Sequence, residues 1–192
     1  MPKQTALQPS ASFSITIRVE LQDRPGVFAR VATAIGRAGG SLGAVDLVDS
    51  KNGTKVRDVV VAAADEGHSR RIADAVQRVN GARVLEVSDR TFRIHQGGKI
   101  EVVPRFPVTS RDDLSMIYTP GVGRVCMAIH RDPALAMTLT IRKNTVAIVS
   151  DGTAVLGLGD IGPLAAMPVM EGKAILFKVF AACDVITVPV IL

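Results

Sequence analysis

The first part of the chain alternates between segments with a two-residue hydrophobic repeat and segments with a helical repeat. Across Ser14–Leu21 apolar and polar residues alternate strictly, which is typical of a strand with one buried face. Across Val27–Ala38 apolar residues recur at nearly 3.6-residue spacing, which predicts an amphipathic helix ended by Gly39-Gly40. Asp23-Arg24-Pro25-Gly26 precedes it and supplies a capping acid and a proline suited to a first helical turn.

Segments with strand-like and helix-like hydrophobic spacing continue to alternate up to about residue 94. The segments expected after the first helix are strands at about 42–48 and 55–64 around the hairpin signal Asn52-Gly53, a helix capped by Ser69, and a last strand at 83–87 that continues through 91–94. This βαββαβ order predicts an α+β, ferredoxin-like domain with both helices on one face of an antiparallel sheet.

After Gly97-Gly98 the pattern changes to prolines, short helical segments and long apolar runs. The segments expected there are helices at about 111–116, 122–130 and 164–180, a buried strand at 146–149, and a final apolar strand that ends the chain. A strand of that apolar kind needs neighbours on both sides, so the second half predicts an incomplete α/β domain. The expected organisation is a flexible tail at 1–12, one domain at 13–96 and a second at 97–192.

Composition narrows the class of protein. The chain has 192 residues, of which 47% are hydrophobic and 4% aromatic, so its core is aliphatic and it is not a disordered chain. Its net charge is +5, but the basic residues of the first half alternate with acids and lack interleaved aromatic residues, so no nucleic-acid partner is expected.

The sequence also predicts where the chain resides. The first twelve residues are polar and lack the apolar segment of a secretory signal. The apolar stretch 174–192 is interrupted by Lys178 and Asp184, so no membrane segment is predicted. Cys126 and Cys183 are two lone thiols without metal-ligand spacing, which indicates a reducing, cytoplasmic location.

The first half resembles the ACT family of small regulatory domains. The resemblance rests on the βαββαβ order and on Asp23-Arg24-Pro25-Gly26-Val27-Phe28, where the family has an Asp-x-Pro-Gly-x-Leu-like pattern. It implies that domains pair and that an amino-acid-like effector binds near this turn, where Gly26 and a helix N-terminus are open to a carboxylate. The effector-binding candidates are Asp23, Pro25, Gly26, Ser41 and Leu42.

One departure from that family keeps an alternative open. The family often has an asparagine near the start of its second strand, whereas this chain has Gly40-Ser41-Leu42. The alternative is an ACT domain that serves dimerisation or has no ligand.

The second half contains three motifs: Ser-Met-Ile-Tyr-Thr-Pro-Gly-Val at 115–122, a glycine-rich run at 144–162, and Pro-Val-Met-Glu-Gly-Lys at 168–173. With these motifs in this order, it resembles the N-terminal part of a bacterial-type malic enzyme. By this resemblance Tyr118 matches the family's catalytic tyrosine and Lys173 its catalytic lysine.

The resemblance implies oxidative decarboxylation of malate to pyruvate and carbon dioxide, with reduction of NAD or NADP and with Mg²⁺ or Mn²⁺. Lys173 would take the proton of the C2 hydroxyl, and Tyr118 would protonate C3 of enolpyruvate. A lysine base has to be neutral, so its ordinary pKa of about 10.4 would have to be lowered by burial or a nearby cation. Outside such motifs a tyrosine of this kind is usually a packing residue, and a lysine on an apolar helix usually extends its amine to water.

Gly157-x-Gly159-x-x-Gly162 follows a strand and precedes a helix, as a dinucleotide-binding fingerprint does. Pro163 directly after the third glycine and the absence of an acid at the end of the next strand argue against that function. The malic enzyme family has its nucleotide-binding domain and metal-binding carboxylates downstream of the part matched here. Cofactor-binding and metal-binding residues are therefore expected to be absent from this chain. Ala154 also stands where longer malic enzymes have an arginine that holds substrate carboxylate.

Three functions remain as hypotheses. The first is the front portion of a malate oxidoreductase in a homo-oligomer, with a regulatory or dimerising ACT domain and no turnover by this chain alone. The second is a stand-alone ACT module that senses a small molecule or mediates an interaction, without catalysis. The third is a nucleotide-binding module that uses the 157–162 glycines.

Overall fold

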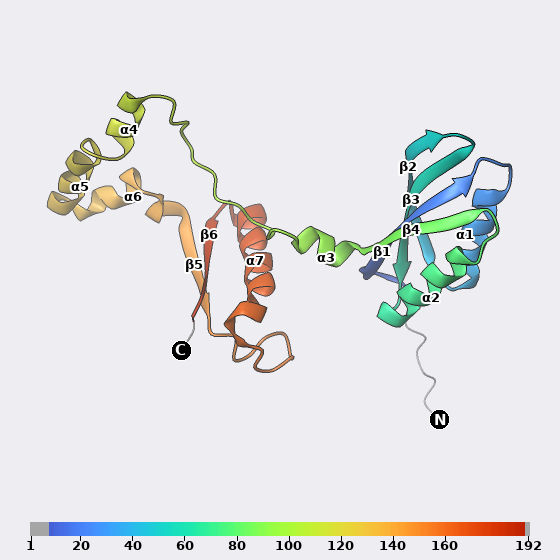
Figure 1. Ribbon diagram of the computed structural model, residues 1–192. Helices are drawn as coiled ribbons and strands as arrows, with labels where there is room; N and C mark the ends of the chain where they lie inside the picture. The colour runs from blue at the N-terminus through green and yellow to red at the C-terminus, as the bar shows by residue number, and fades with distance from the viewer. Residues whose placement is uncertain (1–7, 191–192) are drawn as a thin grey trace. The chain divides into compact units, whose positions relative to one another are not determined.

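The computed structural model describes residues 8–190, and the chain divides into two compact units at the junction of Gln96 and Gly97 (Figure 1). We call residues 1–96 the first unit and residues 97–192 the second unit. Most of the predicted N-terminal tail lies outside the described residues, but Ser10–Ser12 already belong to the first strand.

The first unit is a four-stranded antiparallel sheet with two helices on one face, which confirms the predicted ferredoxin-like βαββαβ fold (Figure 1). The sheet order is β2-β3-β1-β4, so β2 and β4 are the edge strands. The elements are β1 (Ser10–Gln22), α1 (Val27–Arg37), β2 (Ser41–Lys51), β3 (Thr54–Ala63), α2 (Glu66–Gln77), β4 (Ala82–Asp89) and α3 (Arg90–His95).

The core of the first unit lies between the sheet and the two helices. Alternate residues of β1, Ile15 to Leu21, are buried as the sequence pattern predicts, and they pack with Val31 and Ile35 of α1 and Ile72 of α2. The chain comes so close to this core at Gly40 that a Cβ there would stand 2.9 Å from side-chain atoms of Ile72 and Val61. This glycine therefore has a packing role.

Both helix starts differ from the sequence prediction. Gly26 is the N-cap of α1, with a φ of 83° in the left-handed region, whereas Asp23 forms an ion pair with Lys55 at 2.7 Å and does not cap the helix. The cap of α2 is Asp65 instead of the predicted Ser69, because the Asp65 carboxylate accepts the His68 backbone N–H at 2.6 Å.

The predicted continuation of the last strand through residues 91–94 is wrong. These residues form α3, because the Asp89 carboxylate accepts the backbone N–H groups of Thr91 and Phe92 and so caps a helix directly after β4. The Thr91 hydroxyl also donates to the carbonyl of Ser12, which ties α3 to β1.

The second unit is an α/β arrangement around two parallel strands, with α7 alongside them (Figure 1). Its elements are α4 (Arg111–Ile117), α5 (Val122–Arg131), the 3-10 turn η1 (Pro133–Leu135), α6 (Ala136–Leu139), the 3-10 turn η2 (Ile141–Asn144), β5 (Thr145–Ser150), α7 (Gly162–Ala181) and β6 (Asp184–Pro189). The helices and the two strands were predicted, but the turns and short helix at 133–144 were not.

The hydrophobic cluster of the second unit is small. Val155, Ala166 and Met170 are its buried members, with Ile148 and Ile161 packed against them. The predicted final strand is β6, which ends at Pro189, and the last two residues of that prediction lie outside the described part. No helix within residues 8–190 is both long and apolar enough to cross a membrane.

Candidate functional site

Tyr118 ends α4 and lies at the turn between α4 and α5. Its backbone N–H donates to the Leu114 carbonyl at 2.9 Å, and its own carbonyl accepts from the Val122 N–H at 2.8 Å. The tyrosine is therefore held from both sides by helical backbone, while 68% of it is exposed. The side chain of Tyr118 is therefore accessible from solvent at this turn.

The turn after Tyr118 depends on a glycine. The Gly121 N–H donates to the Ser115 carbonyl at 2.8 Å, and a Cβ at Gly121 would stand 2.5 Å from that oxygen. The Thr119–Pro120 peptide between them is cis. The Tyr-Thr-Pro-Gly motif thus forms one tight turn that fixes the place of Tyr118.

Lys173 lies in the middle of α7 and is exposed. The segment that begins the second unit packs beside it, because the Lys99 backbone N–H donates to the Glu171 carboxylate at 3.1 Å. The Lys99 ammonium also donates to the Pro168 carbonyl at 2.7 Å. The Glu-Gly-Lys motif is therefore the place where the start of this unit docks on α7.

The two predicted catalytic residues belong to the same unit but do not touch. Within residues 8–190, no hydrogen bond or ion pair joins Tyr118 to Lys173. Both side chains are exposed, so each is accessible to a ligand. The contacts of Tyr118 and Lys173 therefore do not place the two side chains in one site. A substrate shared by both would have to lie between α4 and α7.

The glycine-rich loop between β5 and α7 has a structural explanation. The Gly152 carbonyl accepts the Ile161 N–H at 3.1 Å, and a Cβ at Gly152 would stand 2.1 Å from the Gly162 backbone. The two ends of the loop are therefore in close contact. Within the loop, the Val155 N–H donates to the Gly159 carbonyl and closes a turn. These glycines serve loop closure, and Pro163 removes one N–H from the start of α7.

Metal ligands are not gathered in the described part of the chain. Within residues 8–190 no group of three or more His, Cys, Asp or Glu side chains is placed to hold a metal ion. Asp184, at the start of β6, forms an ion pair with Lys178 at 2.5 Å. The hydrogen bond from Lys178 is the main cause that lowers the pKa of Asp184.

The predicted effector residues lie at two ends of the first unit. Asp23 follows the end of β1 that pairs with Thr54, whereas Ser41 pairs with Ala62 at the other end of β3. Eight residues of strand separate these two positions, or about 27 Å at 3.4 Å per residue. A small molecule bound to one copy of this unit therefore does not touch both groups.

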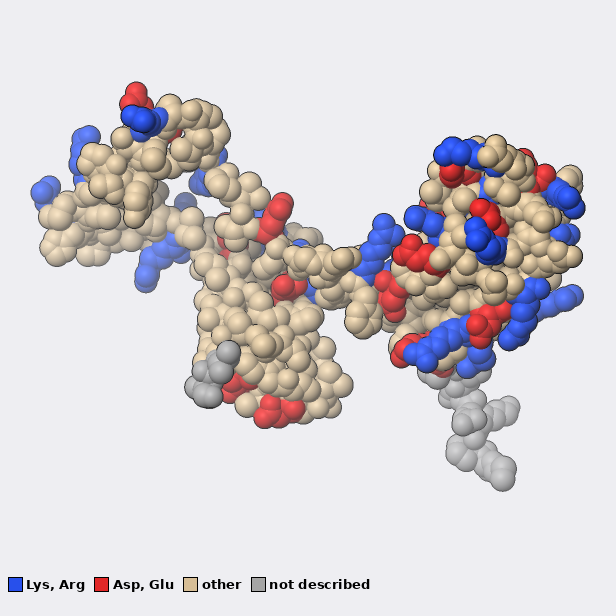
Figure 2. Space-filling view, in the orientation of Figure 1, with Lys and Arg blue, Asp and Glu red and all other residues tan. Residues whose placement is uncertain are grey.

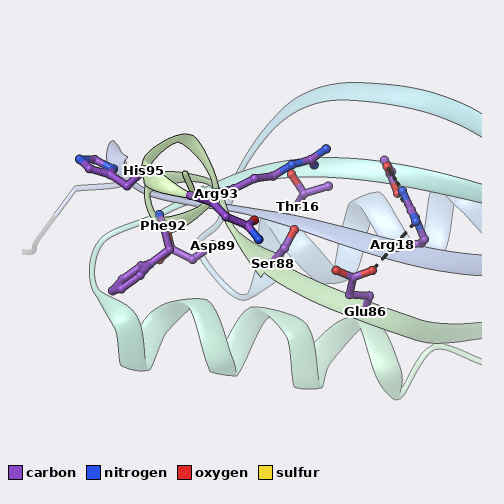
Figure 3. Close-up of a pocket in the computed structure, with 10 residues that line it drawn as sticks. Thr16, Arg18, Glu86, Ser88, Asp89, Phe92, Arg93 and His95 are labelled. Carbon is purple, nitrogen blue, oxygen red and sulfur yellow. Dashed lines mark hydrogen bonds and ion pairs between the residues drawn. The ribbon is translucent and has the colours of Figure 1, made fainter. Parts of the chain in front are cut away.

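A polar hollow of about 730 Å³ lies elsewhere, on the sheet face opposite α1 and α2 (Figure 3). The open face of β1, β3 and β4 and the short helix α3 form its walls. The lining residues are Thr16, Arg18, Asp58, Glu86, Ser88, Asp89, Phe92, Arg93, His95 and Gln96. α3 is thus both a wall of this hollow and the last helix before the second unit.

A ladder of charges crosses the hollow. Arg18 pairs in register with Asp58 of β3 and with Glu86 of β4, so the three side chains form one row. The Arg18 guanidinium donates twice to the Asp58 carboxylate, at 2.8 Å each, and lies 4.0 Å from Glu86. Two parallel bonds of this kind are among the stronger charged contacts in proteins.

The contacts in this row of charges shift the pKa values of Asp58 and Arg18. The hydrogen bond from Arg18 lowers the pKa of Asp58, and the positive charge of Arg93 lowers it further. The hydrogen bond with Asp58 in turn raises the pKa of Arg18. Sequence alternation placed Arg18 on the polar face of β1, but only the strand register shows which acids it meets.

Comparison with known families places both units. A family model described as malic enzyme, N-terminal domain, matches residues 97–192, which is half of the chain. A second family model, the ACT domain, matches residues 15–81.

Individual relatives agree with these matches. The NAD-dependent malic enzyme of Geobacillus stearothermophilus is 54% identical over 179 residues, which is 93% of this chain and 37% of that protein. NAD-dependent malic enzyme 1 of Bacillus subtilis is 44% identical over 86% of this chain and 38% of its own length. The chain thus spans under two-fifths of these relatives. The crystal structure of NAD-dependent malic enzyme from Thermotoga maritima matches with a TM-score of 0.51 and 47% identity, over 54% of this chain and 30% of that one.

Proposed function

The chain belongs to the malic enzyme family, whose N-terminal domain it carries at residues 97–192, and from this premise we propose that it supplies the proton-transfer side chains of a malate oxidoreductase. The observation that carries the proposal is the Tyr-Thr-Pro-Gly turn, which fixes Tyr118 between two helices and exposes it. The ACT unit at the front of the chain is the regulatory or dimerising part.

In the proposed reaction malate is oxidised and decarboxylated to pyruvate and carbon dioxide. Lys173 takes the proton from the C2 hydroxyl, for which a neutral amine is needed. Tyr118 then donates its hydroxyl proton to C3 of the enol form of pyruvate, since a phenol is protonated near neutral pH. Exposure of both side chains supports access to substrate.

The remaining chemistry is that of NAD or NADP, which accepts the hydride, and of a divalent metal, which stabilises the enolate. The described residues offer no three-ligand cluster for such a metal.

A chimera tests the two roles. This chain replaces the matching 179 residues of the Geobacillus stearothermophilus relative, and malate-dependent NADH or NADPH formation is followed with Mn²⁺. We expect activity in the chimera, and a loss of at least about 100-fold in kcat for Tyr118→Phe and for Lys173→Ala. The 192-residue chain by itself is expected to give no turnover.

The matched control is Lys178→Ala. Lys178 lies on the same helix as Lys173 and pairs with Asp184, so its removal should leave kcat within about threefold. Activity of Lys173→Ala equal to that of this control would refute the assignment of the base.

We also propose that the polar hollow of the first unit takes the amino-acid-like effector. Glu86 and Arg93 offer charges of both signs for an ammonium and a carboxylate, and α3 leads directly into the second unit. The test is a thermal-shift screen with amino acids, in which Glu86→Gln and Arg93→Gln lose the shift and Asp23→Asn keeps it. Loss in Asp23→Asn alone would assign the effector to the β1–α1 turn instead.

Association of copies is the third part of the proposal. Exposed apolar side chains in the second unit, such as Val102, Phe106 and Phe180, support a homo-oligomer. Light scattering at several concentrations is expected to give a mass above that of one chain, and a single-chain mass throughout would count against association.

The proposed location is the cytoplasm. The two free thiols, Cys126 and Cys183, fit a reducing compartment of this kind.

A further inference from the structure

A second groove of the first unit lies between α1 and α2, on the side of the helices away from the sheet. Small side chains line it: Ala34 of α1, Ala38 directly after α1, and Ala75 of α2. Four arginines line it too: Arg30 and Arg37 on α1, Arg71 on α2 and Arg78 directly after α2. None of these residues belongs to the sites described above.

The two helices run antiparallel, which decides how the arginines group. The Arg30 guanidinium donates to the Asn80 carbonyl at 3.2 Å, which joins the start of α1 to the end of α2. The His68 ring nitrogen Nε2 lies 2.7 Å from the Ala38 carbonyl, which joins the start of α2 to the end of α1. Arg30 therefore shares one end of the groove with Arg78, and Arg37 shares the other with Arg71.

Each helix carries its two arginines seven residues apart. This is close to two helical turns, so both point along the same seam. At 1.5 Å per residue the two arginine pairs are about 10 Å apart along the groove. The groove volume is about 970 Å³, which is at the upper end of the range for small-molecule sites.

The charge in this groove is not neutralised within the described residues. Asp74 is the one acid that lines it against four arginines, and none of the four arginines forms an ion pair in residues 8–190. Arg18, Arg70 and Arg83 of the same unit have carboxylate partners within 4.0 Å, whereas Arg24 and Arg90 form no ion pair within residues 8–190. Figure 2 shows Lys and Arg side chains over the first unit with acidic side chains among them.

We infer that the α1–α2 groove binds an extended small molecule with two or more phosphate groups. Guanidinium groups match phosphate oxygens with paired hydrogen bonds, and their charge is permanent. A single carboxylate or orthophosphate reaches one arginine pair, whereas a chain of phosphates spans both. The four like charges also oppose pairing of two copies through this face. The inference does not depend on the proposed catalysis, because the groove lies in the first unit.

The test uses the whole 192-residue chain and isothermal titration with inorganic tripolyphosphate, pyrophosphate and orthophosphate. We expect tripolyphosphate to bind at least about tenfold more tightly than orthophosphate. The double variant Arg37→Gln/Arg71→Gln, which removes one pair, is expected to lose at least about tenfold in tripolyphosphate affinity.

The matched control is Arg24→Gln/Arg90→Gln, which removes the same charge from exposed positions outside the groove. Its affinity for tripolyphosphate should remain within about twofold of the parent chain. Equal losses in the two double variants would mean a general charge effect and overturn the site. Absence of binding to the parent chain, or equal affinity for orthophosphate and tripolyphosphate, would also overturn it.

Discussion

The two units differ in how they bury apolar side chains. In the first unit a continuous cluster from β1, β3, α1 and α2 is closed to water, with Ile17, Val31 and Ile72 among its fully buried members. In the second unit the buried cluster consists of Val155, Ala166 and Met170. Large apolar residues there are exposed, with Val102 at 91% and Phe180 at 81%.

The difference follows from the amino-acid patterns. α1 has its apolar residues on one side, so packing on a single sheet face is enough to bury them. α7 is apolar on most sides, yet only Ala166, Met170 and Ala174 are buried. A parallel pair such as β5 and β6 is also usually covered on both faces. The first unit thus buries its apolar residues by its own contacts, whereas the second presents surface suited to further protein contacts.

The largest expected effect comes from separating the units. Residues 1–96 alone should unfold in one cooperative urea transition, because their core is internal. Residues 97–192 alone should unfold gradually and bind the dye ANS, because most of their apolar surface is open. Far-UV circular dichroism and ANS fluorescence measure both. A sharp transition without dye binding in the 97–192 fragment would contradict this contrast.

Cavity variants sharpen the same contrast. Ile17→Ala should cost about 3–4 kcal/mol of unfolding free energy in the first unit, because the residue is fully buried in a well-packed core. Met170→Ala should leave the transition of the first unit unchanged, since it lies in the other unit. Urea titration of the whole chain with a probe on each unit measures this. Leu176→Ala, on the exposed part of α7, is the control for Met170→Ala on the same helix.

Two glycines one turn apart are expected to respond in opposite directions. Gly40→Ala should destabilise the first unit by about 1–3 kcal/mol, because its Cβ would meet Ile72 and Val61 at 2.9 Å. Gly36→Ala should stabilise it by about 0.5–1 kcal/mol, because it lies within α1 with no atom within 4 Å of the new Cβ. Thermal unfolding of the two variants measures the sign. The same sign for both would refute the packing role of Gly40.

The sequence predicts the first unit well because that unit packs on itself. Alternation along Ser14–Leu21 and the helical repeat along Val27–Ala38 reflect burial against the same core, so the hydrophobic pattern is enough to predict these elements.

Local capping is harder to predict. Both Asp65 and Ser69 are suitable caps in sequence, and only the chain path shows that the Asp65 carboxylate meets the His68 N–H.

Contacts between distant segments are not contained in the pattern at all. Arg18 and Asp58 are forty residues apart, and their pairing needs the β1–β3 register. The same applies to Arg37 and Arg71. The seven-residue spacing of Arg30 with Arg37 and of Arg71 with Arg78 is visible in the sequence, but only the antiparallel packing of α1 and α2 brings the two pairs to one groove. Tyr118 and Lys173 were found through family motifs, because neither periodicity nor charge singles them out.

The smallest effect expected is the pH dependence of the Arg18–Asp58 pair. Arg18 holds the pKa of Asp58 below its ordinary value in the folded chain. Stability from this group is therefore fully present above the unfolded pKa of about 3.9 and is lost as pH falls through the lowered folded pKa. Asp58→Asn should destabilise the first unit near neutral pH, and the difference from the parent should shrink below about pH 4. Glu66→Gln, whose partner Arg70 is well exposed, should show a smaller difference at neutral pH. Urea titrations of the first unit between pH 3 and 7 measure both, and a difference for Asp58→Asn that stays constant down to pH 3 would mean that the ladder does not act through this charge.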